Sequence, residues 1–250
     1  MKTTKSELLR LSIVDALVRK DKTINFLFLD GVEDELDVQN ITIQFESYIS
    51  KYPNCGLKID YNTSELHKSD NVQKIAKYIN DLNANNFEKF AALLIKLFDF
   101  ELTYATKQSH DQGIDFIGIK KFKLFDSQRK NYLIGQAKKY NSLVNINEIR
   151  GFAGSVLLLR NREFSQTKDV YKSVFMRSFT SIEGLFATSY FFSPPAQKLC
   201  DNSDIISLDF VDLILLTEKA ILEKTLSIET NDRFIKSKVD KELQNIEILH

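Results

Sequence analysis

The chain has 250 residues and a mass of 28.9 kDa, which suits one large domain or a core domain with a smaller partner. Hydrophobic residues make up 43% of it and include 19 Phe, so the sequence can build a sizeable core and global disorder is excluded. Its 34 basic residues balance 34 acidic ones, and a polyanionic partner would therefore have to be held by a local basic patch.

Cysteine usage and hydropathy indicate the compartment in which the protein works. Cys55 and Cys200 lie far apart and match neither a disulfide framework nor the paired spacing of a zinc site. The sequence contains no uninterrupted apolar run near the ~20 residues that a membrane-spanning helix needs. We therefore expect a soluble, cytoplasmic protein with no membrane partner.

The first part of the chain is predicted to form a smaller, mainly helical domain. Apolar residues follow a helical stripe from Ser6 to Arg19. The acidic run from Asp30 to Asp37 indicates a solvated loop or a helix start, and metal binding is the weaker alternative because no ligand spacing is fixed. Polar residues dominate from Asp60 to Asp70. We therefore predict a recognition or assembly domain over residues 1–75.

Residues 80–250 are predicted to form a layered α/β domain. Asn86 stands where an N-cap belongs, just ahead of the strongest helical pattern, Phe87 to Phe98. Helical and extended patterns then alternate, which is typical of a mixed central sheet flanked by helices. The other expected elements are a connecting helix over 71–83, strands over 101–104, 114–119 and 132–137, a helix over 146–159, extended segments over 174–180 and 185–189, and a helix opened by Pro194-Pro195 after Ser193.

One pair of segments carries the pattern of a catalytic site. Gln136 and Lys138 are two residues apart on a predicted strand, so the pleat points both side chains to one face. Asp115 precedes them by a twenty-residue interval. If Asp115 lies on a neighbouring strand, its carboxylate and the Gln136 carbonyl oxygen can bind a hard divalent cation such as Mg²⁺. Lys138 would then stand beside a metal-bound water, an arrangement suited to phosphodiester hydrolysis.

Each of these residues also has a purely structural interpretation. An Asp near a strand is often a cap or a surface residue, and Gln136 with Lys138 could form the solvent face of an edge strand. His110 and Asp111 are expected to shape the loop before Asp115, with phosphate contact or proton transfer as the lesser alternative. The edge-strand interpretation predicts polar alternation but does not predict Asp115 as a partner.

At these positions the sequence resembles the PD-(D/E)XK nuclease superfamily, and specifically its Mrr-like restriction endonuclease branch, in which Gln replaces the second acidic ligand. The interval between Asp115 and Gln136-Ala137-Lys138 is also similar to that of MspJI-type enzymes. The resemblance covers roughly Phe87 to Leu216. It rests on Phe87-Glu88, Asp111-Gln112-Gly113-Ile114-Asp115, Gln136-Ala137-Lys138, Ile149-Arg150-Gly151-Phe152, Thr188 to Ala196 and Ile205-Ile206-Ser207-Leu208-Asp209.

The resemblance implies a restriction-endonuclease-like fold and a restriction-type endonuclease that cuts double-stranded DNA in defence against foreign DNA. It assigns metal ligation to Asp115, Gln136 and Glu88, with Mg²⁺ as the cofactor and Mn²⁺ as an alternative metal, and it makes Lys138 the catalytic lysine. Glu88 has an equal alternative as an acidic residue favoured by the helix macrodipole. Cleavage of both strands implies a homodimer or higher homo-oligomer. Either a type II or a modification-dependent, type IV-like enzyme fits this pattern.

Two departures from the family limit this transfer. Gln112 stands between Asp111 and Gly113, where the family loop is often richer in glycine. The leading region of some eighty residues is also shorter than the modified-base-reading domain of MspJI-type proteins, so modification dependence does not carry over. Two rival functions remain: a non-catalytic DNA-binding or assembly module of the same fold, and a repair or structure-specific nuclease.

The charge distribution agrees with a DNA partner. Between Lys120 and Tyr140 only Asp126 is acidic, which predicts a local basic surface beside the site; a solvated hairpin is the alternative. Arg150 extends the positive character. The basic residues of this stretch are Lys120, Lys121, Lys123, Arg129, Lys130, Lys138 and Lys139, and the DNA contacts are assigned to Lys120, Lys121, Lys139 and Arg150.

Overall fold

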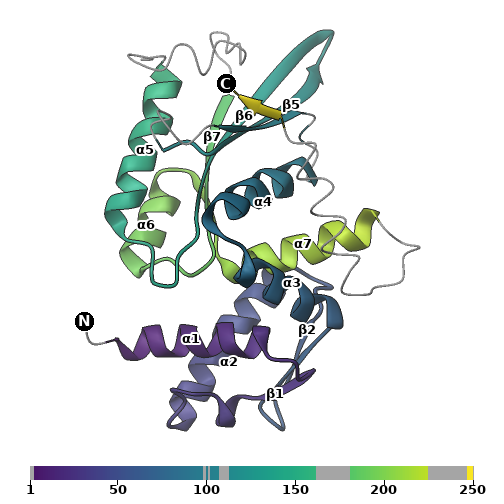
Figure 1. Cartoon of the computed structure of the whole chain (residues 1–250), viewed down its shortest axis with the longest axis vertical. Coiled ribbons are helices and arrows are strands. Elements are labelled where there is room, and N and C mark those ends of the chain that lie inside the picture. The colour runs from purple at the N-terminus through teal and green to yellow at the C-terminus, as the bar shows by residue number, and fades with distance from the viewer. Residues whose placement is uncertain are drawn as a thin grey trace. The chain divides into compact units, whose positions relative to one another are not determined.

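The computed structural model describes residues 3–97, 100, 102–106, 113–161, 181–224 and 247–249 (Figure 1). The chain divides into two compact units. Unit 1 comprises Met1–Asp81 together with Phe210–Lys236, and unit 2 comprises Leu82–Asp209 together with Ser237–His250. The predicted assignment of residues 1–75 and 80–250 to separate roles stays a prediction. None of the described helices is long and apolar enough to cross a membrane.

Among its described residues, unit 1 combines four α-helices and one short 3-10 helix with a small antiparallel sheet. The Thr4 side chain accepts a hydrogen bond from the Glu7 N–H and so caps the first helix, which confirms the helical pattern predicted there. The sheet has the order β1-β3-β2. The elements are α1 (Lys5–Val18), β1 (Thr23–Asn25), η1 (Phe26–Phe28), α2 (Glu35–Lys51), β2 (Leu57–Asp60), β3 (Glu65–Lys68), α3 (Asp70–Asp81) and α7 (Phe210–Lys224).

The acidic run of unit 1 starts a helix. Asp34 is the N-cap of α2, and its carboxylate accepts a hydrogen bond from the Asp37 N–H at 2.9 Å. Asp37 is buried, accepts from the Glu33 N–H at 3.0 Å and pairs with Lys5 at 3.1 Å. Within the described part of the chain, no group of three or more His, Cys, Asp or Glu side chains could hold a metal ion. The acidic run from Asp30 to Asp37 therefore caps and begins helix α2.

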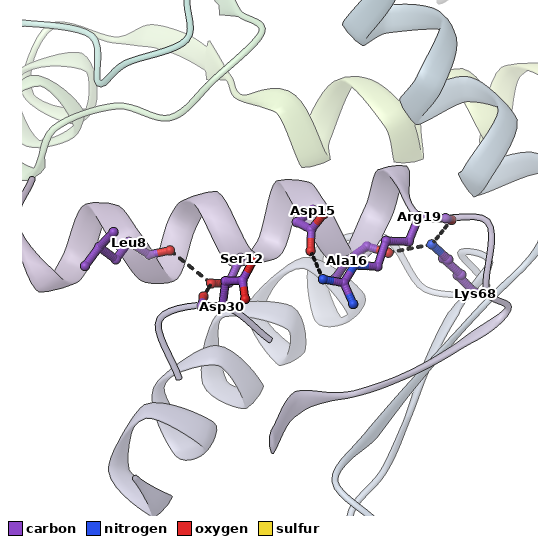
Figure 2. A network of polar contacts seen from close by, with 7 residues as sticks. All are labelled: Leu8, Ser12, Asp15, Ala16, Arg19, Asp30 and Lys68. Carbon is purple, nitrogen blue, oxygen red and sulfur yellow. Dashed lines mark hydrogen bonds and ion pairs between the residues drawn. The ribbon is translucent and has the colours of Figure 1, made fainter. Parts of the chain in front are cut away.

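Helix α1 ends against a buried lysine (Figure 2). Lys68 of β3 donates through Nζ to the carbonyl oxygens of Arg19 at 2.6 Å and Leu17 at 3.3 Å, and also to that of Ala16. These are the acceptors that a helix leaves unpaired at its C-terminal end. Burial lowers the pKa of Lys68 to about 8. Nearer the start of the same helix, the Ser12 hydroxyl donates to the carbonyl oxygens of Leu8 and Asp30.

Helix α7 follows most of unit 2 in sequence, yet it belongs to unit 1, where two buried carboxylates hold it. Asp212 accepts from Lys51 Nζ at 2.7 Å and from the Tyr52 hydroxyl at 2.8 Å. Glu218 accepts from the Gly56 N–H at 2.8 Å and from Ser69 Oγ at 2.6 Å. These bonds satisfy groups that would be costly to bury unpaired.

Unit 2 is built on a mixed sheet of order β8-β7-β6-β5-β4-β9. Neighbours β4, β5 and β6 pair antiparallel, whereas β6–β7, β7–β8 and β4–β9 are parallel. This confirms the predicted α/β class with a central mixed sheet flanked by helices. The strands are β4 (Leu102–Thr106), β5 (Phe116–Leu124), β6 (Ser127–Lys138), β7 (Ser181–Thr188), β8 (Ile205–Leu208) and β9 (Glu247–Leu249); the helices are α4 (Ala84–Leu97), α5 (Ile146–Asn161) and α6 (Pro194–Asn202).

Glycines on the strands show which helix covers which face of this sheet. A Cβ on Gly118 of β5 would lie 2.9 Å from Ile95, so α4 packs closely on that face. A Cβ on Gly184 of β7 would instead meet Val156 of α5 at 3.2 Å. Gly184 pairs with Ile134, and Gln136 lies two residues further along β6. By the alternation of the pleat, Gln136 and Lys138 belong to the α5 face.

Two predicted boundaries need correction, and one segment lies outside the described residues. The N-cap of α4 is Asn83 and not Asn86, because the Asn83 carboxamide oxygen accepts from the Asn86 N–H at 2.9 Å. The strands predicted over 114–119 and 132–137 are longer, since antiparallel pairing continues from Phe116↔Gly135 to Leu124↔Ser127. The extended segment predicted over 174–180 is not among the described residues.

Candidate active site

Asp115 lies immediately before β5 and is locked to β6 by two hydrogen bonds. Its backbone N–H donates to the Gly135 carbonyl oxygen at 2.8 Å, and its carboxylate Oδ2 accepts from the Ala137 N–H, also at 2.8 Å. The residue is 8% exposed. A backbone donor thus fixes the carboxylate between the two residues that the sequence pairs with it, Gln136 and Lys138.

Lys138 is the third residue of the group that Asp115 and Gln136 begin. Its Nζ lies 3.7 Å from Asp115 Oδ2, and its side chain is 30% exposed, so the ammonium faces both the carboxylate and solvent. Gln136 is buried, at 9% exposure. The edge-strand interpretation of Gln136 and Lys138 is wrong, because β6 is paired on both sides, with β5 and with β7.

Gly113 brings the loop before Asp115 against Gln136. Its φ of +77° lies in the left-handed region that glycine adopts without strain. A Cβ built on Gly113 would lie only 2.7 Å from Gln136 Nε2. The absence of a side chain at Gly113 is therefore what allows the backbone to approach the Gln136 carboxamide this closely.

Two further residues border the site and were not predicted from the sequence. The Tyr140 hydroxyl hydrogen-bonds the Glu148 carboxylate, and burial followed by that bond raises the pKa of Tyr140 to about 12, with a smaller contribution from the charge of Asp115. Glu148 Oε2 is buried and has no hydrogen-bond partner among the described residues. Ser189 Oγ accepts from the Tyr140 N–H at 2.9 Å and donates to its carbonyl oxygen at 2.8 Å. Glu148 carries no signal of its own in the sequence, since an acid in the first turn of a helix is ordinary.

The oxygen donors of this site suit a hard divalent cation. The Asp115 carboxylate and the Gln136 amide oxygen are the ligand types that Mg²⁺ takes while keeping several waters. Within the described residues no group of three or more His, Cys, Asp or Glu side chains could hold a metal ion, so a cation bound by Asp115 and Gln136 would keep water in its coordination shell. The residues present therefore fit a weakly chelated Mg²⁺ better than a cation that requires an all-protein cage.

One segment of the chain, which contains the candidate site, matches a known protein family. Residues 79–165, which include Asp115, Gln136 and Lys138, match the family model Mrr_cat, described as a restriction endonuclease. The matched segment is of the Mrr-like restriction endonuclease type. The resemblance predicted from the motif order is thereby confirmed. A comparison with curated protein sequences finds no match.

Solved structures similar to the chain include three restriction endonucleases. MspJI in complex with a 27-mer oligonucleotide is 16% identical at a TM-score of 0.45, and the match covers 70% of this chain and 39% of that one. AspBHI, a DNA modification-dependent restriction endonuclease, is 15% identical at 0.43, covering 64% and 35%. FokI bound to DNA is 12% identical at 0.38, covering 100% and 50%. The chain thus spans half or less of each of these proteins.

In the Mrr-like segment, Glu88 occupies a different helical position from the one expected. With Asn83 as the N-cap, α4 has no acidic residue in its first turn, so the macrodipole explanation of Glu88 is wrong. Glu88 is half-buried near the start of α4, the helix on the face opposite Gln136. The assignment of Glu88 as a metal ligand stays a prediction. It requires the Glu88 carboxylate to reach, from one side of the sheet, a cation that is bound on the other side.

The predicted DNA contacts of the Mrr-like segment lie on different elements. Lys120 and Lys121 belong to the outer part of β5, whereas Lys139 directly follows β6. Arg150 is exposed on α5 and donates through Nη1 to Asn147 Oδ1 at 2.8 Å. Their contact with DNA stays a prediction. His110 and Asp111 lie outside the described residues.

Proposed function

We propose that the Mrr-like segment is a Mg²⁺-dependent endonuclease that hydrolyses phosphodiester bonds in double-stranded DNA. The observation that carries the proposal is the approach of Lys138 Nζ to within 3.7 Å of an Asp115 carboxylate that is held by the Ala137 N–H. A cation, an ammonium and a water can meet there within the reach of one phosphate. Metal-assisted hydrolysis needs this combination.

The roles of the residues follow from their surroundings. Asp115 and Gln136 would hold the cation, with Glu88 as a further ligand and Mn²⁺ as an alternative metal. The bound ion would polarise a phosphoryl oxygen and neutralise developing charge. Lys138 is partly exposed, so its ammonium can orient the attacking water while the buried Asp115 carboxylate keeps it in place.

Beyond the chemistry, we propose a restriction-type enzyme that works in the cytoplasm in defence against foreign DNA. Residues 1–75 would select the target or mediate assembly, and a homodimer or higher homo-oligomer would cut both strands. Both a type II enzyme and a modification-dependent, type IV-like enzyme fit this scheme. The two are separated by whether methylation blocks or enables cleavage.

The first test is cleavage of methylated and unmethylated plasmid by the full chain with Mg²⁺ or with EDTA. Metal-dependent cutting that is lost in Asp115→Ala supports the nuclease, and the preferred plasmid shows whether modification is read. Cutting in EDTA, or equal cutting by Asp115→Ala, would remove this site from the reaction.

A second candidate is a non-catalytic DNA-binding or assembly module of the same fold. It is favoured by the partners that Asp115 has within the protein, the Ala137 N–H at 2.8 Å and Lys138 Nζ at 3.7 Å, which hold its carboxylate whether or not a metal binds. Such a module would bind DNA with equal affinity in Mg²⁺ and EDTA and would cut neither plasmid.

A further inference from the structure

The β5–β6 hairpin, defined here as residues 116–138, is longer than the site requires. Its outer part, from Lys120 to Asn131, is joined by the turn Phe125-Asp126 and projects beyond α4 in Figure 1. Every residue from Phe125 to Lys130 is exposed. The outer hairpin therefore adds little to the core and is available to a partner.

Phe125 at the tip is unfavourable both for the turn and for solvation. Its side chain is 93% exposed, so the ring is almost wholly in water. Its φ of +53° lies in the left-handed region, which bulky residues rarely adopt. Two-residue hairpin turns usually place Asn, Asp or Gly at such a position. An Asn or Gly would thus suit the isolated fold better, which points to a role for the ring outside the fold.

The charges along the outer hairpin favour an anionic partner. Lys121 lies directly opposite Lys130, and like charges facing each other across strands disfavour the pair. No ion pair between described residues involves Lys123, Arg129 or Lys130. A polyanion would relieve this repulsion.

The distance between the hairpin tip and the site fits duplex DNA as that polyanion. Lys130 and Gln136 are six residues apart on β6, so they share a face of the sheet and lie ~20 Å apart at ~3.4 Å per residue. Phosphates follow each other along a DNA duplex at about one charge per 1.7 Å of axis, and one turn spans about 34 Å. A single duplex can therefore run from the site to the hairpin tip.

We propose that the tip of the β5–β6 hairpin is a DNA wedge, in which Phe125 inserts against the bases while the surrounding cations contact the phosphates. Apolar side chains that unstack base steps and aromatic rings that stack on bases are both established ways of gripping DNA. The phosphate contacts come from Lys121, Lys123 and Lys130, which lie on the same face of the hairpin as Gln136. The inference rests on the proposed function, because it takes duplex DNA as the substrate.

The chain has no Trp, so Phe125→Trp introduces a single indole at the tip, which can be excited selectively over the nine Tyr. The full-length variant is titrated with a mixed-sequence duplex of about 30 base pairs in EDTA, which prevents metal-dependent cleavage. Stacking on bases should quench the indole emission as DNA binds. The matched control is Phe28→Trp, which places the reporter at another exposed Phe, on η1 of unit 1, and should stay unchanged.

Affinity and stability provide the second measurement. Phe125→Asn should fold at least as stably as the wild type, because Asn suits the turn, while duplex affinity falls by about tenfold, a factor within the range reported for removing one base–aromatic stack. Unchanged affinity together with an unquenched reporter would overturn the wedge but leave the nuclease in place. An emission change with anionic lipid vesicles and none with DNA would also overturn it. A wild-type chain that binds no duplex would overturn both proposals.

Discussion

The carboxylate of Asp115 accepts a hydrogen bond from the backbone N–H of Ala137 at 2.8 Å, which places it between Gln136 and Lys138. Because the donor belongs to the backbone, no substitution at residue 137 other than proline removes it. The orientation of the proposed metal ligand is therefore part of the pairing between β5 and β6.

This bond makes Asp115→Asn a cleaner test of chemistry than Asp115→Ala. The Asn carboxamide oxygen can still accept from Ala137, so the melting temperature should change little, while the loss of the carboxylate should reduce cleavage by about 100-fold or more. Plasmid cleavage and thermal unfolding of the same preparation check this. Retained cleavage with an intact fold would exclude Asp115 as a metal ligand.

Lys138→Ala should lose cleavage while keeping DNA binding. A positioned proton donor or acceptor contributes roughly 10²- to 10⁴-fold to a rate, and the partly exposed side chain is not needed for the core. Single-turnover cleavage and duplex binding are measured in parallel. Lys198→Ala, an exposed lysine on α6, is the control and should leave both unchanged. Normal cutting by Lys138→Ala would remove the lysine from the mechanism.

Gly113→Ala should disturb Gln136 and not only the loop. The new Cβ would meet Gln136 Nε2 at 2.7 Å on a backbone with φ +77°, so we expect a loss of stability greater than about 1 kcal/mol and weaker Mg²⁺ binding. Chemical denaturation and calorimetric metal titration measure the two effects. The control is Gly154→Ala within α5, whose Cβ would meet nothing within 4 Å and which should stabilise by about 0.5–1 kcal/mol. Equal behaviour of the two variants would contradict the role given to Gly113.

The sequence predicts the site better than it predicts the elements around it. Asp115, Gln136 and Lys138 follow from the two-residue period of a strand and from an ordered motif, and the structure brings Asp115 and Lys138 together. The orientation of Asp115 could not be predicted, because a backbone N–H donor leaves no trace in residue identity. Tyr140 and Glu148 were missed for a related reason. Tyr140 follows the end of β6 and Glu148 lies at the start of α5, and the periodicity of neither element predicts that the two side chains meet.

The placement of helix α7 in unit 1 could not be predicted from sequence patterns. Phe210, Val211, Leu213, Ile214 and Leu215 are all buried, and a nearly continuous apolar run does not distinguish a buried helix from a strand. Its place in unit 1 depends on Asp212 and Glu218, which find partners about 160 residues earlier in the chain. Such long-range pairs are set by tertiary structure alone.

Tyr140→Phe tests the pair that borders the site. Removing the hydroxyl leaves the Glu148 carboxylate without its donor, which should cost roughly 1–3 kcal/mol of unfolding free energy. Burial, followed by the bond to Glu148, raises the pKa of Tyr140 from its usual 10 to about 12, so the stability that the neutral hydroxyl contributes is complete below pH 10 and is lost as pH rises toward 12. Urea denaturation from pH 8 to pH 12 should show a decline that is weaker in Tyr140→Phe. The same decline in both proteins would exclude the pair as its source.

Glu218→Ala should destabilise the chain although it lies far along the sequence from the residues it binds. The variant leaves the Gly56 N–H and the Ser69 hydroxyl without their acceptor in a buried setting, and we expect a loss of about 2–4 kcal/mol. Leu222→Ala, at a residue of α7 that is 46% exposed, is the control and should cost much less. Because α7 completes unit 1, a fragment of residues 1–81 should also fail to unfold cooperatively, whereas addition of a peptide spanning 210–224 should restore structure. A fragment of 1–81 that melts like the intact unit would show that α7 is dispensable for it.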